Sequence, residues 1–197
     1  VFQIGFDKQL QELMEKNVAF DQDRVEDMRA AGPAILAEVE DALEDYFGDY
    51  EVFSSEEKLY VPIENFNIHF KGFVAAVVKV GDTYHLFDWK TCSWGWDSRR
   101  KAEKIVTYQL TLYKHFFCQK HKIDPEKVET HFALLKRTAK KNRVEIFRVT
   151  SGEKKTENAL KLLYQAIYNI TKGVTIKNRL RCHKPYPCKL YNTEHCR

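Results

Sequence analysis

The sequence predicts an α/β protein in which a mixed β-sheet is flanked by helices. Apolar residues recur three and four positions apart near the N-terminus, again over residues 98–120 and over residues 157–172, as in amphipathic helices. Between these segments, β-branched and aromatic residues form runs with partial alternation, which is typical of strands. Helical and extended segments therefore follow one another along the chain in the order expected for a sheet covered by helices.

The N-terminal helical region spans residues 7–47. A first helix carries an apolar stripe that ends near Val18, and a second helix is expected from about Asp21 through Phe47. Gly32-Pro33 predicts a break or a fresh start inside this second helix, because proline lacks the backbone N–H of a helix interior. Gly48 is a typical helix terminator.

The extended segments come next. Strands are expected over residues 50–53, 58–63, 66–80, 83–91, 131–136 and 143–149. Gly81-Asp82 is a tight-turn signal, so the two strands around it should form a hairpin. This outline is shared by many unrelated proteins, and it does not by itself indicate a function.

Composition places the chain among globular proteins, and the distribution of charge bears on its partner. Hydrophobic residues make up 44% of 197 residues, with 8 Gly and 5 Pro, which argues against a disordered or fibrous chain. The net charge is +4; acids crowd the first 57 residues and basic residues dominate from Lys90 onward. This asymmetry suits a polyanion such as a nucleic acid as partner, but from charge alone an ordinary solvated surface with uneven charge is the favoured interpretation. No apolar run is long enough to span a bilayer, so no membrane partner is expected.

The hairpin contains the chemically informative residues. Side chains alternate between the faces of a strand, so Asp88 and Lys90 should project side by side while Trp89 points the other way. A carboxylate can hold a divalent cation that activates water against a phosphate, and a nearby lysine can orient that water or stabilise the transition state. Oxygen ligands suit Mg²⁺ or Mn²⁺. The alternative is a simple Asp-Lys ion pair at a strand end.

Three segments together resemble a known family. Gly72-Phe-Val-Ala75 precedes the hairpin turn, Asp88-Trp-Lys90 follows it, and Gln109-Leu-Thr-Leu-Tyr113 lies on the next helix. Gln109 and Tyr113 share a helix face because they are four residues apart. The combination resembles the PD-(D/E)XK nuclease superfamily, specifically its RecB-like branch, which also includes phage exonucleases. The resemblance covers roughly residues 32 to 150.

The resemblance implies a restriction-endonuclease-like core and a DNA nuclease dependent on Mg²⁺ or Mn²⁺. It implies an exonuclease acting on DNA ends in recombination, repair or phage DNA processing. Asp88 and the backbone carbonyl of Trp89 would hold metal, Lys90 would position or activate water, and Gln109 and Tyr113 would lie near the scissile phosphate. The chain would comprise an N-terminal helical segment, the nuclease core and a cysteine-bearing tail. These parts span residues 1–31, 32–175 and 176–197.

Position 75 departs from the family pattern. The family places a metal-binding acid there, whereas this chain has Ala75. The resemblance therefore implies weak metal binding and slow or absent cleavage in the present form. Either an engineered acid-to-Ala change or a naturally inactive relative would explain the departure. The otherwise complete motif favours the engineered change.

The family also takes a metal ligand from the helix before the sheet. The spacing from Ala34 fits Glu38, and Glu40 is the second choice. Because this helix is crowded with acids, the alternative is that both side chains simply face water.

Residues around the next helix are candidates for DNA contact. Its first turns carry four basic residues, although helix N-termini usually favour acids. Phosphate binding would explain Arg99, Arg100, Lys101 and Lys104. In the preceding loop, Trp94 and Trp96 could stack on unpaired bases, or they could pack onto the sheet.

The chain ends in a cysteine cluster. Thiolates at the spacing of Cys182, Cys188 and Cys196 can hold zinc or an iron-sulfur cluster. RecB-like nucleases often carry a [4Fe-4S] cluster with a fourth cysteine upstream of the first helix, but no cysteine precedes Cys92 here. Unligated thiols are the alternative. The odd total of 5 Cys and the lack of a visible signal peptide predict an intracellular setting.

Two other functions are compatible with the sequence. Ala75 supports a non-catalytic DNA- or protein-binding module on a decayed nuclease fold. A structure-specific or RNA-directed endonuclease is the second, since nothing in the sequence separates cutting at ends from internal cutting.

Overall fold

The computed structural model describes residues 2–175, 188, 190, 191, 193 and 194. The chain forms two compact units, Val1–Ala159 and Leu160–Arg197. The first unit contains helices α1 (Phe2–Glu15), α2 (Gln22–Leu36), α3 (Val39–Phe47), α4 (Ser98–Lys101) and α5 (Lys104–His121), a short 3-10 turn (Pro125–Lys127) and every strand. Helix α6 (Glu153–Thr171) begins in the first unit and continues into the second.

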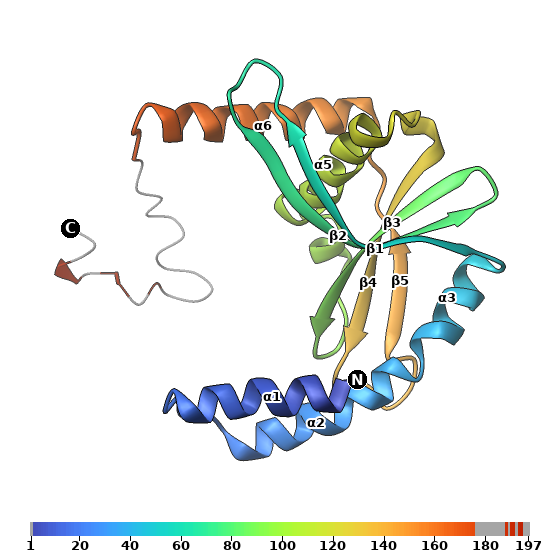
Figure 1. The fold of residues 1–197 in the computed structure, drawn as a ribbon, viewed down its shortest axis with the longest axis vertical. Coiled ribbons are helices and arrows are strands. Elements are labelled where there is room, and N and C mark those ends of the chain that lie inside the picture. The colour runs from blue at the N-terminus through green and yellow to red at the C-terminus, as the bar shows by residue number, and fades with distance from the viewer. Residues whose placement is uncertain (1, 176–187, 189, 192, 195–197) are drawn as a thin grey trace. The chain divides into compact units, whose positions relative to one another are not determined.

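The first unit is built on a five-stranded mixed sheet in the order β1-β2-β3-β4-β5 (Figure 1). The strands are β1 (Glu51–Pro62), β2 (His69–Val80), β3 (Thr83–Cys92), β4 (Val128–Lys136) and β5 (Val144–Arg148). Neighbours pair antiparallel except β3 and β4, which are parallel. Parallel neighbours need a long crossover, and here that crossover contains α4 and α5. The predicted α/β class, a mixed sheet flanked by helices, is confirmed.

Both faces of the sheet are covered. On one face, Phe87 and Ala133 pack with Leu43 and Phe47 of α3 and with Tyr50, which follows α3. On the other face, Phe132 packs with Leu110 of α5 and with Val149 after β5. Phe87, Ala133 and Phe132 are completely buried. The two helical layers therefore receive alternate residues of the same strands, as the pleat requires.

The N-terminal helices differ from the sequence prediction at one point. Pro33 lies inside α2, and the break comes later, at Ala37 and Glu38. Gly32 has a packing role instead, because a Cβ there would overlap the Phe2 ring of α1. The glycine thus permits close approach of α1 to α2 and does not end the helix.

The strand boundaries also differ in part. The two short strands expected over residues 50–63 form a single strand, β1, with an irregularity between Val52 and Ser54. The hairpin at Gly81-Asp82 is confirmed, with β2 and β3 antiparallel around it. The helix expected over residues 98–120 is interrupted between Lys101 and Lys104, so it forms α4 and α5.

A charged contact ties α5 to the edge of the sheet. Glu57 of β1 accepts hydrogen bonds from Lys120 Nζ at 2.6 Å and from His121 Nε2 at 2.8 Å. Burial opposes ionisation of this carboxyl, but the two hydrogen bonds outweigh it and lower the pKa of Glu57. Ionised Glu57 therefore stabilises the packing of α5 on β1.

The predicted cysteine site lies mostly outside the described residues. Cys182 and Cys196 are not among them, and Cys188 is an exposed free thiol. The zinc or iron-sulfur site at these cysteines and the three-part division of the chain remain predictions. Within the described part of the chain, no helix combines the length and apolar character needed to cross a membrane.

Candidate active site

Strand β3 presents Asp88 and Lys90 on the face covered by α5. Their intervening neighbour, Trp89, packs with the α3-side cluster around Phe87. Lys90 Nζ lies 5.8 Å from the centre of the Phe132 ring, which belongs to the α5-side cluster. The alternation that the sequence predicts for this strand is therefore present.

The two residues join Gln109 and Tyr113 of α5 in one polar group. Lys90 Nζ lies 2.5 Å from Asp88 Oδ2 and donates to Gln109 Oε1 at 3.0 Å. Gln109 Nε2 donates to Tyr113 Oη at 3.0 Å and approaches Asp88 Oδ1 at 3.5 Å. Four residues from two motifs, spread over 26 residues of sequence, thus converge on one face of the sheet.

The polar group is accessible from the Lys90 side. The Asp88 side chain is 11% exposed and that of Lys90 is 31% exposed. Asp88 Oδ2 is a buried oxygen that lacks a hydrogen bond with any described residue, since the approach of Lys90 has ion-pair distance without hydrogen-bond geometry. A buried carboxylate oxygen in this state retains a lone pair for a cation or a ligand.

Gly72 of β2 explains how Tyr113 reaches this group. A Cβ at Gly72 would lie 2.9 Å from Tyr113 Cε1 and 3.0 Å from Phe70 Cε1. The missing side chain leaves room for the Tyr113 ring, whose hydroxyl meets Gln109. The glycine of the first motif and the tyrosine of the third are therefore coupled by packing.

Position 75 lies one residue beyond the paired register of β2 and β3. Strands β2 and β3 pair from Val80 opposite Thr83 to Ala76 opposite Phe87, and one further step of this register puts Ala75 opposite Asp88. Directly opposed residues in an antiparallel pair share a face and have Cβ atoms about 4.5–5.5 Å apart. A carboxylate at position 75 would consequently lie within reach of a cation held by Asp88.

Glu38 does not join this group in the structure. Its Oε2 accepts a hydrogen bond from the backbone N–H of Arg143 at 2.7 Å, and its Oε1 lies 3.5 Å from Arg143 Nε. Within the described residues, no contact links Glu38 to Asp88. Because the helix break falls at Ala37 and Glu38, the carboxylate is positioned to cap the start of β5.

A basic cavity of about 680 Å³ lies on the same face, beside the N-terminus of α5. No Asp or Glu lines the cavity. Its lining includes five basic residues: Lys101, Lys104, Arg148, Lys154 and Lys155. Lys101 is paired with Glu145 at 2.5 Å, whereas Lys104 and Lys154 form no ion pair with a described residue. The excess positive charge suits an anionic ligand.

The other predicted DNA contacts divide into exposed and packed residues. Arg99 and Arg100 are exposed, and the Arg100 guanidinium lies 4.9 Å from the centre of the Trp96 ring. Trp96 also packs edge-on against Phe132, so it belongs to the core and is not a free stacking surface. Trp94, by contrast, is 79% exposed and presents its ring to solvent.

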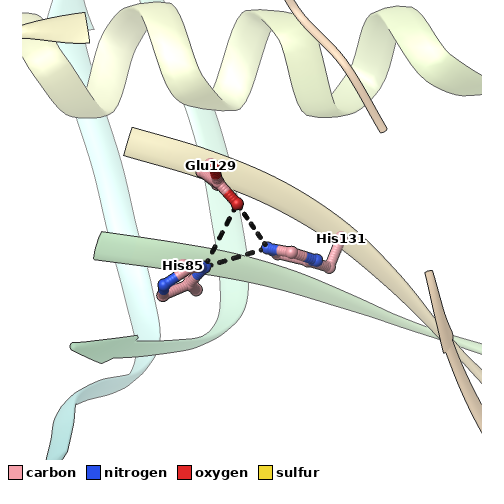
Figure 2. A group of neighbouring side chains, drawn as sticks. All are labelled: His85, Glu129 and His131. Atoms are coloured by element: carbon pink, nitrogen blue, oxygen red, sulfur yellow. Dashed lines mark hydrogen bonds and ion pairs between the residues drawn. The ribbon is translucent and has the colours of Figure 1, made fainter. Parts of the chain in front are cut away.

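A second cluster of ligating side chains lies on the opposite, α3-covered face and was not predicted. His85 of β3 and Glu129 and His131 of β4 bring their ring nitrogens and a carboxylate oxygen within 4.8 Å of one another (Figure 2). Burial, with smaller effects from His85 and Arg148, lowers the pKa of His131 to about 3. Burial likewise lowers the pKa of His85. The closeness of the three ligating atoms means that the group could bind a metal.

The sequence carries only a weak signal for these additional residues. Glu129 and His131 are two apart on a strand and so share a face, but His85 reaches them through pairing across 46 residues. The α6 lysines of the basic cavity likewise approach Lys104 only in the fold. Such long-range pairings cannot be derived from local periodicity.

Comparisons with known proteins show the fold. No family model matches the sequence, and no curated protein does. The crystal structure of a "Putative exonuclease" from Eubacterium rectale superimposes with a TM-score of 0.53 at 13% identity, over 95% of this chain and 73% of that chain. The structure of SSO0001 gives a TM-score of 0.44 at 12% identity, over 92% of this chain and 76% of that chain. The chain therefore has an α/β fold similar to that of a protein described as an exonuclease.

Proposed function

We propose that this chain is a divalent-metal-dependent deoxyribonuclease of the RecB-like branch of the PD-(D/E)XK superfamily. The observation that carries the proposal is the hydrogen-bonded group formed by Asp88, Lys90, Gln109 and Tyr113. A bare ion pair at a strand end would not require Gln109 and Tyr113 to reach across from α5. Their convergence supports a site assembled for chemistry.

Asp88 fits a metal site that is completed by substrate. Its Oδ2 is buried without a hydrogen bond to any described residue, and Mg²⁺ typically binds through one or two carboxylates together with substrate phosphates. The backbone carbonyl of Trp89 would be a further ligand. When bound, the metal would polarise the phosphate and lower the pKa of a coordinated water. With Ala75 in place of an acid, affinity should be low.

The protein side chains supply positioning and charge. Lys90, within 2.5 Å of Asp88 and partly exposed, would orient the attacking water and offset charge that develops on the phosphate. Gln109 donates to Tyr113 and accepts from Lys90, so it fixes the lysine amine in place. The pair from α5 would thereby hold the scissile phosphate beside Asp88.

The DNA strand would approach along the α5-covered face. The Phe132 ring contacts residues of both sites: it packs against Phe147, which lines the basic cavity, and Lys90 Nζ of the Asp88 group lies 5.8 Å from its centre. Lys104 and Lys154 would bind backbone phosphates, and exposed Trp94 would offer a ring for an unpaired base. We infer exonuclease action on DNA ends, in recombination, repair or phage DNA processing, from the resemblance of the motifs.

The test restores the acid and compares two substrates. The Ala75→Asp protein, with Mg²⁺ or Mn²⁺, is expected to release labelled nucleotides from end-labelled linear DNA while leaving closed circular DNA intact. Asp88→Asn in the same background should abolish release. Cleavage of circular DNA would replace the exonuclease proposal with an endonuclease.

A non-catalytic DNA-binding module is the second candidate, and Ala75 is the observation that favours it. That function predicts DNA binding by the unchanged chain and no cleavage by the Ala75→Asp protein with either metal. Retained binding and fold in an inert Ala75→Asp protein would therefore overturn the nuclease proposal.

A further inference from the structure

The α3-covered face of the sheet carries a group of ligating side chains separate from the candidate active site. His85 and Glu129 are register partners on the parallel strands β3 and β4, and His131 follows Glu129 on the same face (Figure 2). Asp88 and Lys90 project from the other face. We propose that His85, Glu129 and His131 form a binding site for a transition metal of the zinc type.

The distances fit a small tetrahedral ion. His85 Nδ1 lies 3.1 Å from His131 Nε2, and Glu129 Oε2 lies 3.7 Å from the first nitrogen and 3.9 Å from the second. Bonds of about 2.0–2.2 Å in tetrahedral geometry separate the ligand atoms of Zn²⁺ by roughly 3.3–3.6 Å. Shifts of a few tenths of an ångström would complete the site.

The carboxylate position distinguishes a metal site from a simple hydrogen-bonded trio. In the absence of a cation, the two imidazoles can share one proton across 3.1 Å. Glu129 Oε2, however, is too far from both ring nitrogens for a hydrogen bond. The oxygen therefore faces two nitrogen atoms that it does not bond, and a cation between the three atoms would satisfy all of them.

Two neighbouring residues, Arg148 and Tyr46, contact the sides of Glu129 and His131 that would not face the metal. Arg148 Nη2 lies 2.8 Å from Glu129 Oε1, which leaves Oε2 free for a metal. Tyr46 Oη lies 3.5 Å from His131 Nδ1, the ring nitrogen opposite the ligating Nε2. Such outer contacts fix the orientation of metal ligands and raise affinity.

The surroundings favour a nitrogen-preferring metal. Phe47 packs against the rings of His85 and His131, and Phe87 packs against the ring of His131. The His131 side chain is 1% exposed. Two imidazoles and one carboxylate suit Zn²⁺ or Co²⁺ better than Mg²⁺. Glu129 and Arg148 also line a cavity of about 360 Å³. Three protein ligands leave a fourth position for water.

The experiment measures metal binding by the full-length chain, independently of nuclease activity. Because the C-terminal cysteines could also bind zinc, the measurements use a background with Cys182, Cys188 and Cys196 changed to Ser, alongside the unchanged chain. Zn²⁺ binding is measured by competition with a chromophoric chelator. Co²⁺ binding is followed by visible absorption, which is intense for tetrahedral and weak for octahedral coordination. The melting temperature with and without Zn²⁺ is the third readout.

The proposal expects one Zn²⁺ per chain, a tetrahedral Co²⁺ spectrum and a higher melting temperature with Zn²⁺. Glu129→Gln and His85→Gln should each weaken binding about 100-fold or more, and Arg148→Met about 10-fold. His69→Gln, at an exposed histidine on β2, should leave binding unchanged. Absence of stoichiometric binding in the cysteine-free background, or equal binding by the Glu129→Gln protein with its fold intact by circular dichroism, would overturn the proposal.

Discussion

Gly72 is the position at which one added methyl group tests the packing behind the candidate active site. In the Gly72→Ala protein, the new Cβ would lie 2.9 Å from Tyr113 Cε1 and 3.0 Å from Phe70 Cε1. Gly72 does not have a positive φ, so alanine suits its backbone conformation. The outcome therefore depends on whether the two rings can move.

Two opposing effects set the expected magnitude. Overpacking in a filled region costs about 1–3 kcal/mol. Replacing glycine by alanine restricts the unfolded chain and stabilises by about 0.4–1 kcal/mol. Because Tyr113 is held at its hydroxyl by Gln109 and both contacts are tighter than ordinary van der Waals contact, we expect overpacking to prevail, with a net destabilisation of about 1–2 kcal/mol.

The assay is the free energy of unfolding from urea denaturation followed by circular dichroism. The matched control is Gly152→Ala, where the new methyl group meets open space; it should be neutral or slightly stabilising. In a Tyr113→Leu background, Gly72→Ala should lose much of its cost, since the ring is gone. A Gly72→Ala protein as stable as the unchanged chain, or one equally destabilised in both backgrounds, would refute this account of the glycine.

Three further predictions concern stability, thiol chemistry and DNA affinity. Glu57→Gln should lower the free energy of unfolding by about 2 kcal/mol at pH 7. Because the pKa of Glu57 is lowered in the folded protein, this loss of stability should persist above the unfolded pKa and disappear as the pH falls through the folded pKa. A loss of stability that does not change with pH would contradict the prediction. Burial raises the pKa of the Cys118 thiol to about 11, so at pH 8 mass spectrometry should find Cys188 alkylated and Cys118 unmodified until denaturant is added. Reversing charge at Lys104 and Lys154 together should weaken DNA binding at least about 10-fold and flatten its salt dependence; unchanged salt dependence would remove the basic cavity from the DNA path.

Local sequence patterns were sufficient for the hairpin and for the side-chain directions within β3. Gly81-Asp82 specifies a turn by its backbone preferences, and alternation then places Asp88 and Lys90 on one face. The four-residue spacing of Gln109 and Tyr113 puts both on one side of α5. These features depend on residues close in sequence, so periodicity and turn chemistry determine them.

Features that depend on distant segments were not accessible in the same way. The spacing rule that selected Glu38 assumes a helix continuing past Ala37, whereas α2 ends at Leu36 and the Glu38 carboxylate accepts a hydrogen bond from the backbone N–H of Arg143. Trp96 could not be assigned to the core without knowing that Phe132 and Phe147 lie beneath the loop. In each case a tertiary contact decides, and no local pattern encodes its partner.

The most direct test of the central claim locates the metal that Asp88 is proposed to hold. Crystals of the Ala75→Asp protein are soaked in Mn²⁺, and the anomalous difference map is calculated. We predict a peak about 2.0–2.3 Å from an Asp88 carboxylate oxygen and within bonding distance of the side chain at position 75. A fully ordered site with the Asp88 carboxylate still closed onto Lys90 and no peak between positions 75 and 88 would contradict the account.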